Sequence, residues 1–128
     1  MRLLLDTHVF LWWNEANPRL SRRAYDLLSD PSNRLFLSVV SVWEIVLKAH
    51  TRKLKLPSAA ADYIPARLAH YDIEALPLIL SHVLAAEDLP PNHRDPFDRI
   101  LVAQAQVERL RIVTHDPQIR RYEIETVW

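Results

Sequence analysis

The chain has 128 residues and contains neither glycine nor cysteine. The lack of glycine excludes glycine-rich phosphate loops, dinucleotide-binding turns and the G-x-S-x-G nucleophile turn. The lack of cysteine excludes thiol nucleophiles, zinc fingers and disulfide frameworks. Lys plus Arg and Asp plus Glu each number 16, so the formal net charge is zero and gives no sign of binding to nucleic acid by overall charge. The length fits one domain over residues 1–128.

No apolar stretch approaches the roughly 20 residues that a membrane-spanning helix needs. The first apolar run, Leu3 to Leu5, ends at Asp6, which is too early for a secretory signal. We therefore expect a cytoplasmic protein with no membrane association.

Short apolar, β-prone segments alternate with helical segments along the chain. The predicted strands are 3–5, 35–40, 73–76, 112–114 and 124–128. The predicted helices are 9–14, 21–29 with Ser21 as its cap, 41–50, 58–71 interrupted at Pro65, 81–89, 97–109 and a short one at 116–122. The alternation predicts an α/β fold with a mainly parallel central sheet of four to five strands flanked by helices. In such sheets the functional site lies outside the carboxyl ends of the strands.

Acidic residues recur where predicted strands end or helices begin. They are Asp6, Glu44, Asp95, Asp98 and Asp116. Carboxylates gathered at one edge of a sheet would repel one another by roughly 4 kcal/mol per pair at 4 Å and an effective dielectric near 20. A hard divalent cation such as Mg²⁺ or Mn²⁺ would neutralise them, because these ions prefer oxygen ligands.

Helix capping is the alternative role for these acids. Ser41-Val42-Trp43-Glu44 fits a capping box, and Asp95-Pro96 and Asp116-Pro117 both fit an N-cap followed by proline. Asp6 and Asp98 fit capping less well. Asp6 directly follows a strand and has no helix to cap unless one begins at once, and Asp95 already supplies the cap beside Asp98.

Four segments resemble the motifs of PIN domains, in the family's order and across the whole chain. The first is Asp6-Thr7-His8 after the leucine run, and the second is Ser38-x-x-Ser41-x-Trp43-Glu44-Ile45 followed by Lys48. The third is His93-Arg94-Asp95-Pro96-Phe97-Asp98-Arg99-Ile100-Leu101-x-Ala103-Gln104-Ala105, and the fourth is Val113-Thr114-His115-Asp116. The segment from Tyr122 to Trp128 is similar to the family's usual ending. Within the family, the chain most resembles the VapC-type toxins of bacterial type II toxin–antitoxin systems.

The resemblance implies a metal-dependent endoribonuclease with Mg²⁺ or Mn²⁺ as cofactor. Its acidic quartet of catalytic and metal-binding residues falls on Asp6, Glu44, Asp98 and Asp116, with Asp95 as an additional acid. Thr7 and Thr114 stand beside acids, where a hydroxyl would bond to a carboxylate or a phosphate. The family's partners are a VapB-type antitoxin that blocks the site and a second copy of the toxin, so the resemblance also implies a homodimer.

Basic residues cluster near the second and third motifs. Outside the five acids, the chain carries 16 basic and 11 acidic residues. The candidates for RNA phosphate contacts are Lys48, Arg52, Lys53, Arg94 and Arg99. A solvated surface run is the alternative for residues 52–55, and pairing with a site carboxylate is the alternative for Arg99.

Histidines also lie near the proposed ligands. His8, His93 and His115 are each within two positions of one, and we expect them to pack or to contact RNA. In a metal-free ribonuclease they would instead act as acid and base. His50, His70 and His82 have no acid nearby in the sequence and are expected at the surface or as satisfied core residues.

Two rival functions share this pattern, and two positions depart from the family. The rivals are a PIN-type nuclease with an RNA-processing role and a non-enzymatic binding module whose acids only cap helices. Arg52 stands where relatives commonly carry glycine, and Glu123 where small residues are frequent. Without glycine, we expect left-handed helix ends at asparagines such as Asn14 and Asn33.

Overall fold

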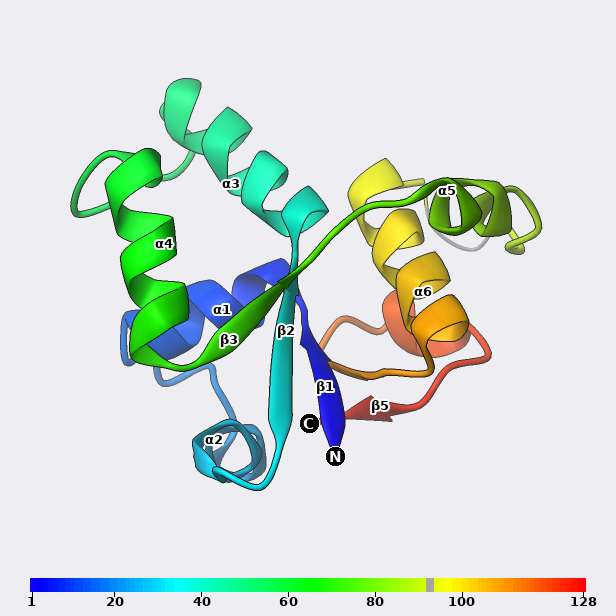
Figure 1. The fold of residues 1–128 in the computed structure, drawn as a ribbon, viewed down its shortest axis with the longest axis horizontal. Coiled ribbons are helices and arrows are strands. Elements are labelled where there is room, and N and C mark those ends of the chain that lie inside the picture. The colour runs from blue at the N-terminus through cyan, green and yellow to red at the C-terminus, as the bar shows by residue number, and fades with distance from the viewer. Residues whose placement is uncertain (92–93) are drawn as a thin grey trace.

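Five short strands form one parallel sheet in the computed structural model, which describes residues 1–91 and 94–128 (Figure 1). The strands are β1 (Arg2–Leu5), β2 (Arg34–Ser38), β3 (Ile73–Leu76), β4 (Arg111–Val113) and β5 (Thr126–Val127). They pair in the order β3-β2-β1-β4-β5, and all four pairings are parallel. The predicted α/β fold with a parallel central sheet is confirmed.

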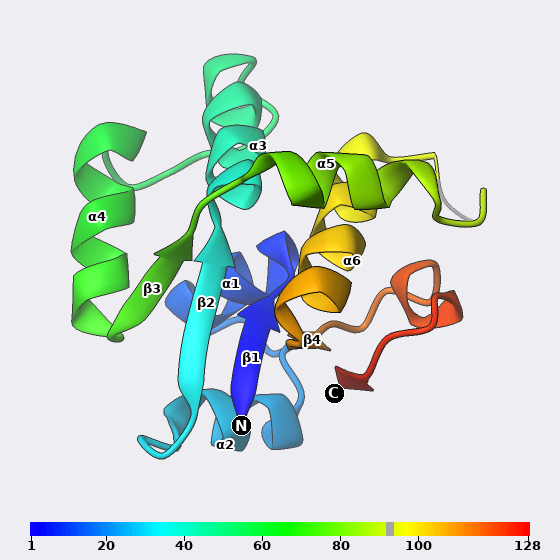
Figure 2. The same cartoon turned by 45° about the vertical axis from the view of Figure 1, so that its right-hand side comes forward.

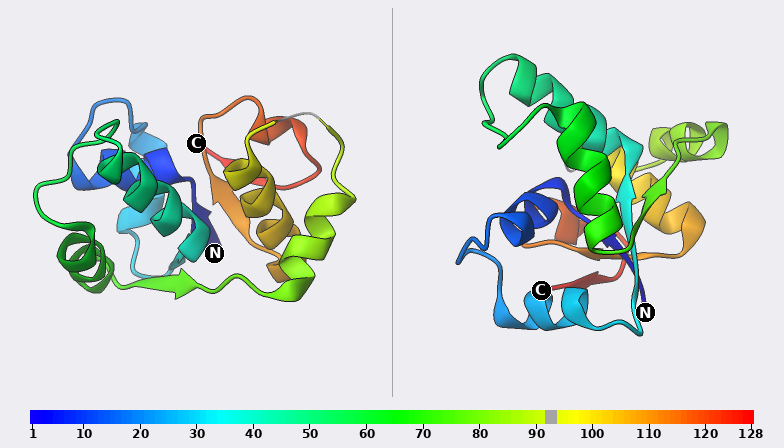
Figure 3. Two further views of the ribbon diagram at one scale, coloured as in Figure 1. Left: turned by 90° about the horizontal axis from the view of Figure 1, so that it is seen from above. Right: turned by 60° about the vertical axis from the view of Figure 1, so that its left-hand side comes forward.

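Helices cover both faces of the sheet. They are α1 (Thr7–Asn14), α2 (Arg22–Ser29), α3 (Val39–His50), α4 (Ala60–His70), α5 (Leu80–Glu87), α6 (Pro96–Glu108) and the short 3₁₀ helix η1 (Ile119–Arg121). Seen from above, α1 to α4 lie on one side and α5 and α6 on the other (Figure 3, left). In the described part of the chain, no helix is both long enough and apolar enough to cross a membrane.

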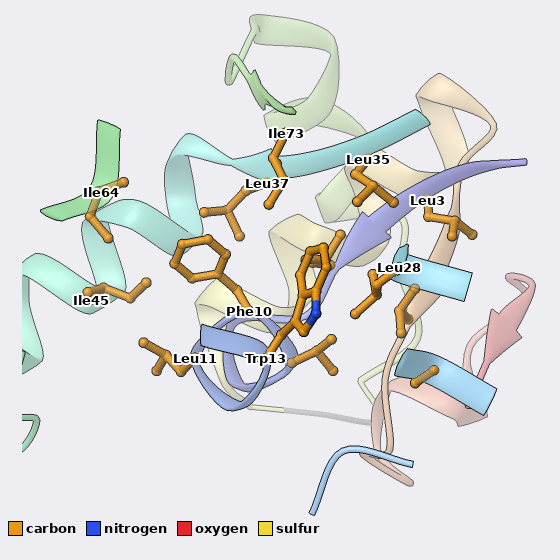
Figure 4. Close-up of a cluster of buried hydrophobic side chains, with 14 residues drawn as sticks. Leu3, Phe10, Leu11, Trp13, Leu28, Leu35, Leu37, Ile45, Ile64 and Ile73 are labelled. Carbon is orange, nitrogen blue, oxygen red and sulfur yellow. The ribbon is translucent and has the colours of Figure 1, made fainter. Parts of the chain in front are cut away.

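The leucine run of β1 is buried on both faces of the sheet. Leu3 and Leu5 belong to the core that α1, α2 and α4 close, in which Phe10 and Trp13 are the largest side chains (Figure 4). Leu4 points to the opposite core, which α6 closes. Central parallel strands are typically apolar at every position for this reason, because helices pack on both of their faces.

Helix α3 begins two residues earlier than predicted. Strand β2 ends at Ser38, whose hydroxyl accepts a hydrogen bond from the backbone N–H of Val40 at 3.0 Å and caps the helix. Ser41 therefore lies inside the first turn, and its hydroxyl accepts a hydrogen bond from Thr7 Oγ1 at 2.8 Å. The predicted capping box from Ser41 to Glu44 is wrong, and Glu44 lies in the second turn.

Helix α1 begins directly after β1, so Asp6 does have a helix to cap. Its Oδ1 accepts a hydrogen bond from the backbone N–H of His8 at 3.2 Å. Pro65, which we expected to break the fourth helix, lies inside α4 without interrupting it. Proline removes one backbone hydrogen bond there, and the rest of the helix supplies enough others.

Among the described residues, left-handed backbone occurs at four positions, each just beyond a helix end. They are Ala16, Arg52, Asp72 and Arg109, with φ between 53° and 61°. Neither Asn14 nor Asn33 is among them, so that prediction is wrong. The end of each helix decides which residue takes the left-handed conformation. For each of these four residues that conformation costs about 1–2 kcal/mol of conformational energy relative to ordinary helical backbone.

The strand order locates the functional edge of the sheet. From β1 the chain proceeds outward through β2 and β3, then returns to the other side of β1 for β4 and β5 (Figure 2). The order therefore reverses between β1 and β4. Ligands of open α/β sheets bind at the carboxyl ends of the strands at such a reversal.

Candidate active site

Asp6 occupies the point where the strand order reverses. Its backbone N–H donates to the carbonyl of Val113 in β4 at 3.1 Å, which extends the pairing of β1 with β4 by one residue. Its carboxyl is buried, and Oδ2 accepts a hydrogen bond from the hydroxyl of Thr114 at 2.7 Å. With Oδ1 held by the His8 backbone, both oxygens have fixed directions.

The surroundings of Asp6 disfavour its charge. Burial raises the pKa of the Asp6 carboxyl, and the negative charge of Asp116 raises it further. The hydrogen bond from Thr114 and the nearby His8 lower the pKa but do not cancel the effect of burial. The negative charge of Asp116 thus acts on the Asp6 carboxyl across the β1–β4 pairing, and a bound cation would offset this repulsion.

Asp116 is held by the same hydroxyl. Its backbone N–H donates to Thr114 Oγ1 at 3.0 Å, and its own Oδ1 accepts a hydrogen bond from the Gln118 N–H at 2.8 Å. Thr114 therefore bridges the two acids from its position after β4. Asp116 also orders the turn before η1, but the N-cap of η1 is Gln118, so the predicted N-cap at Asp116 is wrong.

Glu44 approaches this edge from α3. Its side chain is buried, and Oε2 accepts a hydrogen bond from Lys48 Nζ at 2.6 Å. The other oxygen, Oε1, is buried without a hydrogen-bond partner among the described residues. The bond from Thr7 to Ser41, one turn before Glu44, holds this face of α3 against the end of β1.

Asp95 and Asp98 come from the start of α6. Asp95 Oδ1 accepts a hydrogen bond from the Phe97 N–H at 2.9 Å, so Asp95 is the N-cap, as its sequence predicts. Asp98 lies in the first turn and is partly buried. The rings of Trp43 and Phe97 meet edge to face at 5.2 Å, which joins the start of α6 to the helix that carries Glu44.

The donor groups suit a hard divalent cation. Among residues 1–91 and 94–128, no three acidic or histidine side chains are grouped closely enough to hold a metal ion as they stand. The unpartnered Oε1 of Glu44 and the buried carboxylate of Asp6 nevertheless each gain from a cation, and the proposed ligands offer only oxygen. Such a donor set fits Mg²⁺ or Mn²⁺.

The basic candidates divide into two groups. Arg52, Lys53 and Arg94 are exposed, whereas Lys48 pairs with Glu44. Arg52, with its left-handed backbone, stands directly after α3 and its cap residue Thr51.

Arg99 is held by backbone carbonyls at the end of α5 and in the segment that follows it. Its guanidinium donates to the carbonyls of Ala86, Leu89 and Pro90 at 2.9–3.2 Å and to the Tyr122 hydroxyl at 3.3 Å. Carbonyls at a helix C-terminus lack partners within the helix, and a guanidinium satisfies several at once. Arg99 thus anchors α5 to α6, a role that its own sequence neighbourhood does not reveal.

The histidines take different roles. His8 is exposed and lies 3.9 Å from Asp6 Oδ1, and the ring of His115 packs beside Trp128 at 5.0 Å. His93 lies outside the described residues. His82 is a satisfied core residue, as one of the two expectations has it, because its buried Nε2 lies 2.8 Å from Oε1 of Glu108, an acid 26 positions away in the sequence.

Three comparisons place the chain among known proteins. The sequence profile of the PIN domain matches residues 3–125. The chain is 27% identical over 130 residues to Ribonuclease VapC22 of Mycobacterium tuberculosis, covering 98% of both proteins.

Solved structures show the same fold. The VapBC2 structure from Rickettsia felis, bound to a promoter DNA fragment, has a TM-score of 0.74 at 15% identity, covering 99% of this chain and 98% of that one. The DNA-bound VapBC structure from Salmonella typhimurium has a TM-score of 0.68 at 16% identity, covering 99% and 97%. Since the profile match spans nearly the whole chain and every proposed acidic ligand, the chain belongs to the PIN-domain family.

Proposed function

We propose that this chain is a metal-dependent endoribonuclease and the toxin of a type II toxin–antitoxin system. Nucleases of the PIN-domain family generally use divalent metal ions, and one similar protein is named a ribonuclease. The observation that carries the proposal is the pair of buried carboxylates at the carboxyl end of the sheet. Asp6 is held there by Thr114, and Glu44 keeps one oxygen without a hydrogen-bond partner among the described residues.

The proposed ligands of Mg²⁺ or Mn²⁺ are Asp6, Glu44, Asp98 and Asp116, with Asp95 beside them. When bound, the ion supplies an activated water near neutral pH and relieves charge on the phosphoryl group. Thr114 fixes the direction of the Asp6 carboxylate, and the Thr7–Ser41 bond fixes α3 relative to it. Arg52, Lys53 and Arg94 contact the flanking RNA phosphates from the rim.

Two partners belong to the proposal, a VapB-type antitoxin and a second copy of the chain. The similar solved structures from Rickettsia felis and Salmonella typhimurium are VapBC complexes. The surface of α3, of α5 and of the segment before α5 offers apolar area to such partners. Its exposed large apolar side chains are Val39, Trp43, Val46, Leu47, Leu78, Ile79, Leu80, Val83 and Leu84. Groups of exposed apolar side chains are typical of protein contact surfaces.

Some contacts favour the non-enzymatic alternative. Asp6, Asp95 and Asp116 each accept a hydrogen bond from a backbone N–H of the following turn, as capping residues do. Glu44 does not cap a helix, since its carboxylate lies in the second turn against Lys48. An RNA-processing nuclease would use the same site and differ only in its substrate.

The test is cleavage of a mixed RNA pool by the wild type and by Asp6→Asn. We expect cleavage that depends on Mg²⁺ or Mn²⁺ and that EDTA abolishes. The cleavage rate of the variant should fall by at least about a hundredfold, because the charge of one metal ligand is removed. Asp26→Asn is the matched control, because Asp26 is an exposed acid on α2 paired with Arg22. Equal cleavage by Asp6→Asn and wild type would contradict the site. No cleavage at any metal concentration would favour the binding module.

A further inference from the structure

The Glu44–Lys48 pair joins a buried anion to a cation that reaches in from solvent. Lys48 Nζ lies 2.6 Å from Glu44 Oε2, and the side chains of Glu44 and Lys48 are 5% and 41% exposed. The residues are four apart on α3 with the acid first, the favourable order on a helix. Lysine carries its charge on a flexible, strongly hydrated head group, so the ammonium can leave for water without rearranging the backbone.

Only half of the Glu44 carboxylate is satisfied by this pair. Oε2 has the ammonium, whereas Oε1 is buried without a hydrogen-bond partner in the described part of the chain. Asp6 is different, since both of its oxygens accept hydrogen bonds. A buried carboxylate needs compensation for its lost hydration. Lys48 is therefore the principal compensation that Glu44 has when no metal ion is bound.

We propose that Lys48 is the resident counter-ion of Glu44 and that a divalent cation binding at Glu44 competes with it. Lys48 thereby sets how tightly the site binds its metal ion. The inference rests on the metal site of the proposed function. It gives Lys48 a positioning role at a carboxylate, in place of the phosphate contact expected from the sequence.

The positive charge of Lys48 decides whether its removal strengthens or weakens metal binding. An ammonium beside the carboxylate repels an incoming divalent cation and already neutralises one of its ligands. A unit charge within about 5 Å of a divalent ion changes its binding by roughly tenfold in a water-like dielectric. Removing the ammonium should therefore tighten metal binding, although it leaves the metal-free protein with a buried and unpaired carboxylate.

The first measurement is calorimetric titration with Mn²⁺, without RNA and at low salt. We expect Lys48→Met to bind Mn²⁺ roughly tenfold more tightly than the wild type. Lys48→Arg keeps the charge and should stay within about twofold of the wild type. Lys53→Met is the matched control, because it removes the same charge from an exposed lysine five residues further on.

The second measurement is thermal unfolding in EDTA and in saturating Mn²⁺. Lys48→Met should unfold at a lower temperature than Lys53→Met in EDTA, and Mn²⁺ should raise its unfolding temperature by more than it raises that of the wild type. If Lys48 had only a structural role, its substitution would lower the unfolding temperature by an amount that Mn²⁺ does not recover. If Lys48→Met does not fold, Lys48→Gln replaces it, since a neutral amide can still donate to Glu44.

The outcomes separate this inference from the proposed function. Binding of Mn²⁺ by Lys48→Met or Lys48→Gln that is equal to or weaker than wild-type binding overturns the role of Lys48 and leaves the metal site intact. Absence of Mn²⁺ binding by the wild type removes the metal site itself, and the inference falls with it. Tighter binding in both neutral variants, with wild-type binding in Lys48→Arg, supports the competition.

Discussion

The two ends of the sheet carry charged residues under opposite conditions. At the carboxyl end, the side chains of Asp6 and Glu44 are only 7% and 5% exposed. At the amino end, Arg34 and Glu74 form a two-pronged pair at 2.9 and 3.0 Å on neighbouring strands, and their side chains are 59% and 53% exposed. The carboxyl-end acids have lost most of their water, while the amino-end charges keep much of theirs.

The difference in exposure separates charges that affect stability little from charges that suit the binding of an ion. Exposed ion pairs contribute about 0–1 kcal/mol, because water already solvates both partners. A buried carboxylate lowers the stability of the fold unless hydrogen bonds or a cation compensate for its lost hydration. The carboxyl end holds such groups in fixed directions, which is an arrangement suited to binding an ion and not to stabilising the sheet.

Thr114→Val should have the largest effect on stability. The substitution keeps the side-chain shape but removes the hydroxyl that donates to Asp6 and accepts from the Asp116 N–H. Two polar groups at a buried site then lose a partner, so the free energy of unfolding should fall by about 2–4 kcal/mol. Urea denaturation measures this change.

Two substitutions serve as controls for Thr114→Val: a conservative one at the same position and the same threonine-to-valine change at an exposed position. Thr114→Ser keeps the hydroxyl and should recover most of the loss. Thr51→Val removes an exposed hydroxyl that donates to backbone carbonyls at the end of α3, and it should cost less than about 0.5 kcal/mol. A loss below about 1 kcal/mol in Thr114→Val would mean that the hydroxyl does not hold the two acids.

The stability of the protein should also depend on pH through Asp6, measured in EDTA. Burial raises the pKa of the Asp6 carboxyl above its unfolded value of 3.8. Between the unfolded and folded values the native state binds more protons, so the contribution of Asp6 is present below the unfolded pKa and is lost as pH rises through the folded pKa. The stability of Asp6→Asn relative to the wild type should therefore increase with rising pH.

Saturating Mn²⁺ should reverse this trend, because the ion binds the ionised carboxylate. Urea denaturation of both proteins from about pH 4 to pH 8 is the measurement. A difference that stays flat across this range would show that the Asp6 carboxyl is solvated in the folded protein, contrary to its burial.

The parts of the fold that follow from local pattern were predictable. The leucine run fixes β1, and the alternation of strands with helices fixes the parallel sheet. Asp95 caps α6 before Pro96 as its sequence predicts, since both residues act on the backbone next to them. The acids also lie where strands end, which needs only the correct placing of the strands.

The parts that depend on distant contacts were not predictable. Ser41 was expected to cap a helix, but Ser38 caps it and Ser41 bonds to Thr7, 34 positions away. Arg99 lies in a recognisable motif, yet its partners are carbonyls from the end of α5 and the segment that follows. The left-handed residue after α3 is Arg52, at the position that the resemblance to the family singles out, and no propensity of arginine predicts it.

The smallest effect should come from the amino end of the sheet. A double-mutant cycle on Arg34→Ala and Glu74→Gln should give a coupling of about 0.5–1 kcal/mol, which falls as salt is raised from 0.05 to about 0.5 M. A single nitrogen, Arg34 Nη2, donates to both oxygens of Glu74, and the exposure of both side chains keeps the coupling within that range. A salt-independent coupling above about 2 kcal/mol would mean that the pair behaves as buried. The contrast between the two ends of the sheet would then rest on the geometry of each charged group and not on its exposure.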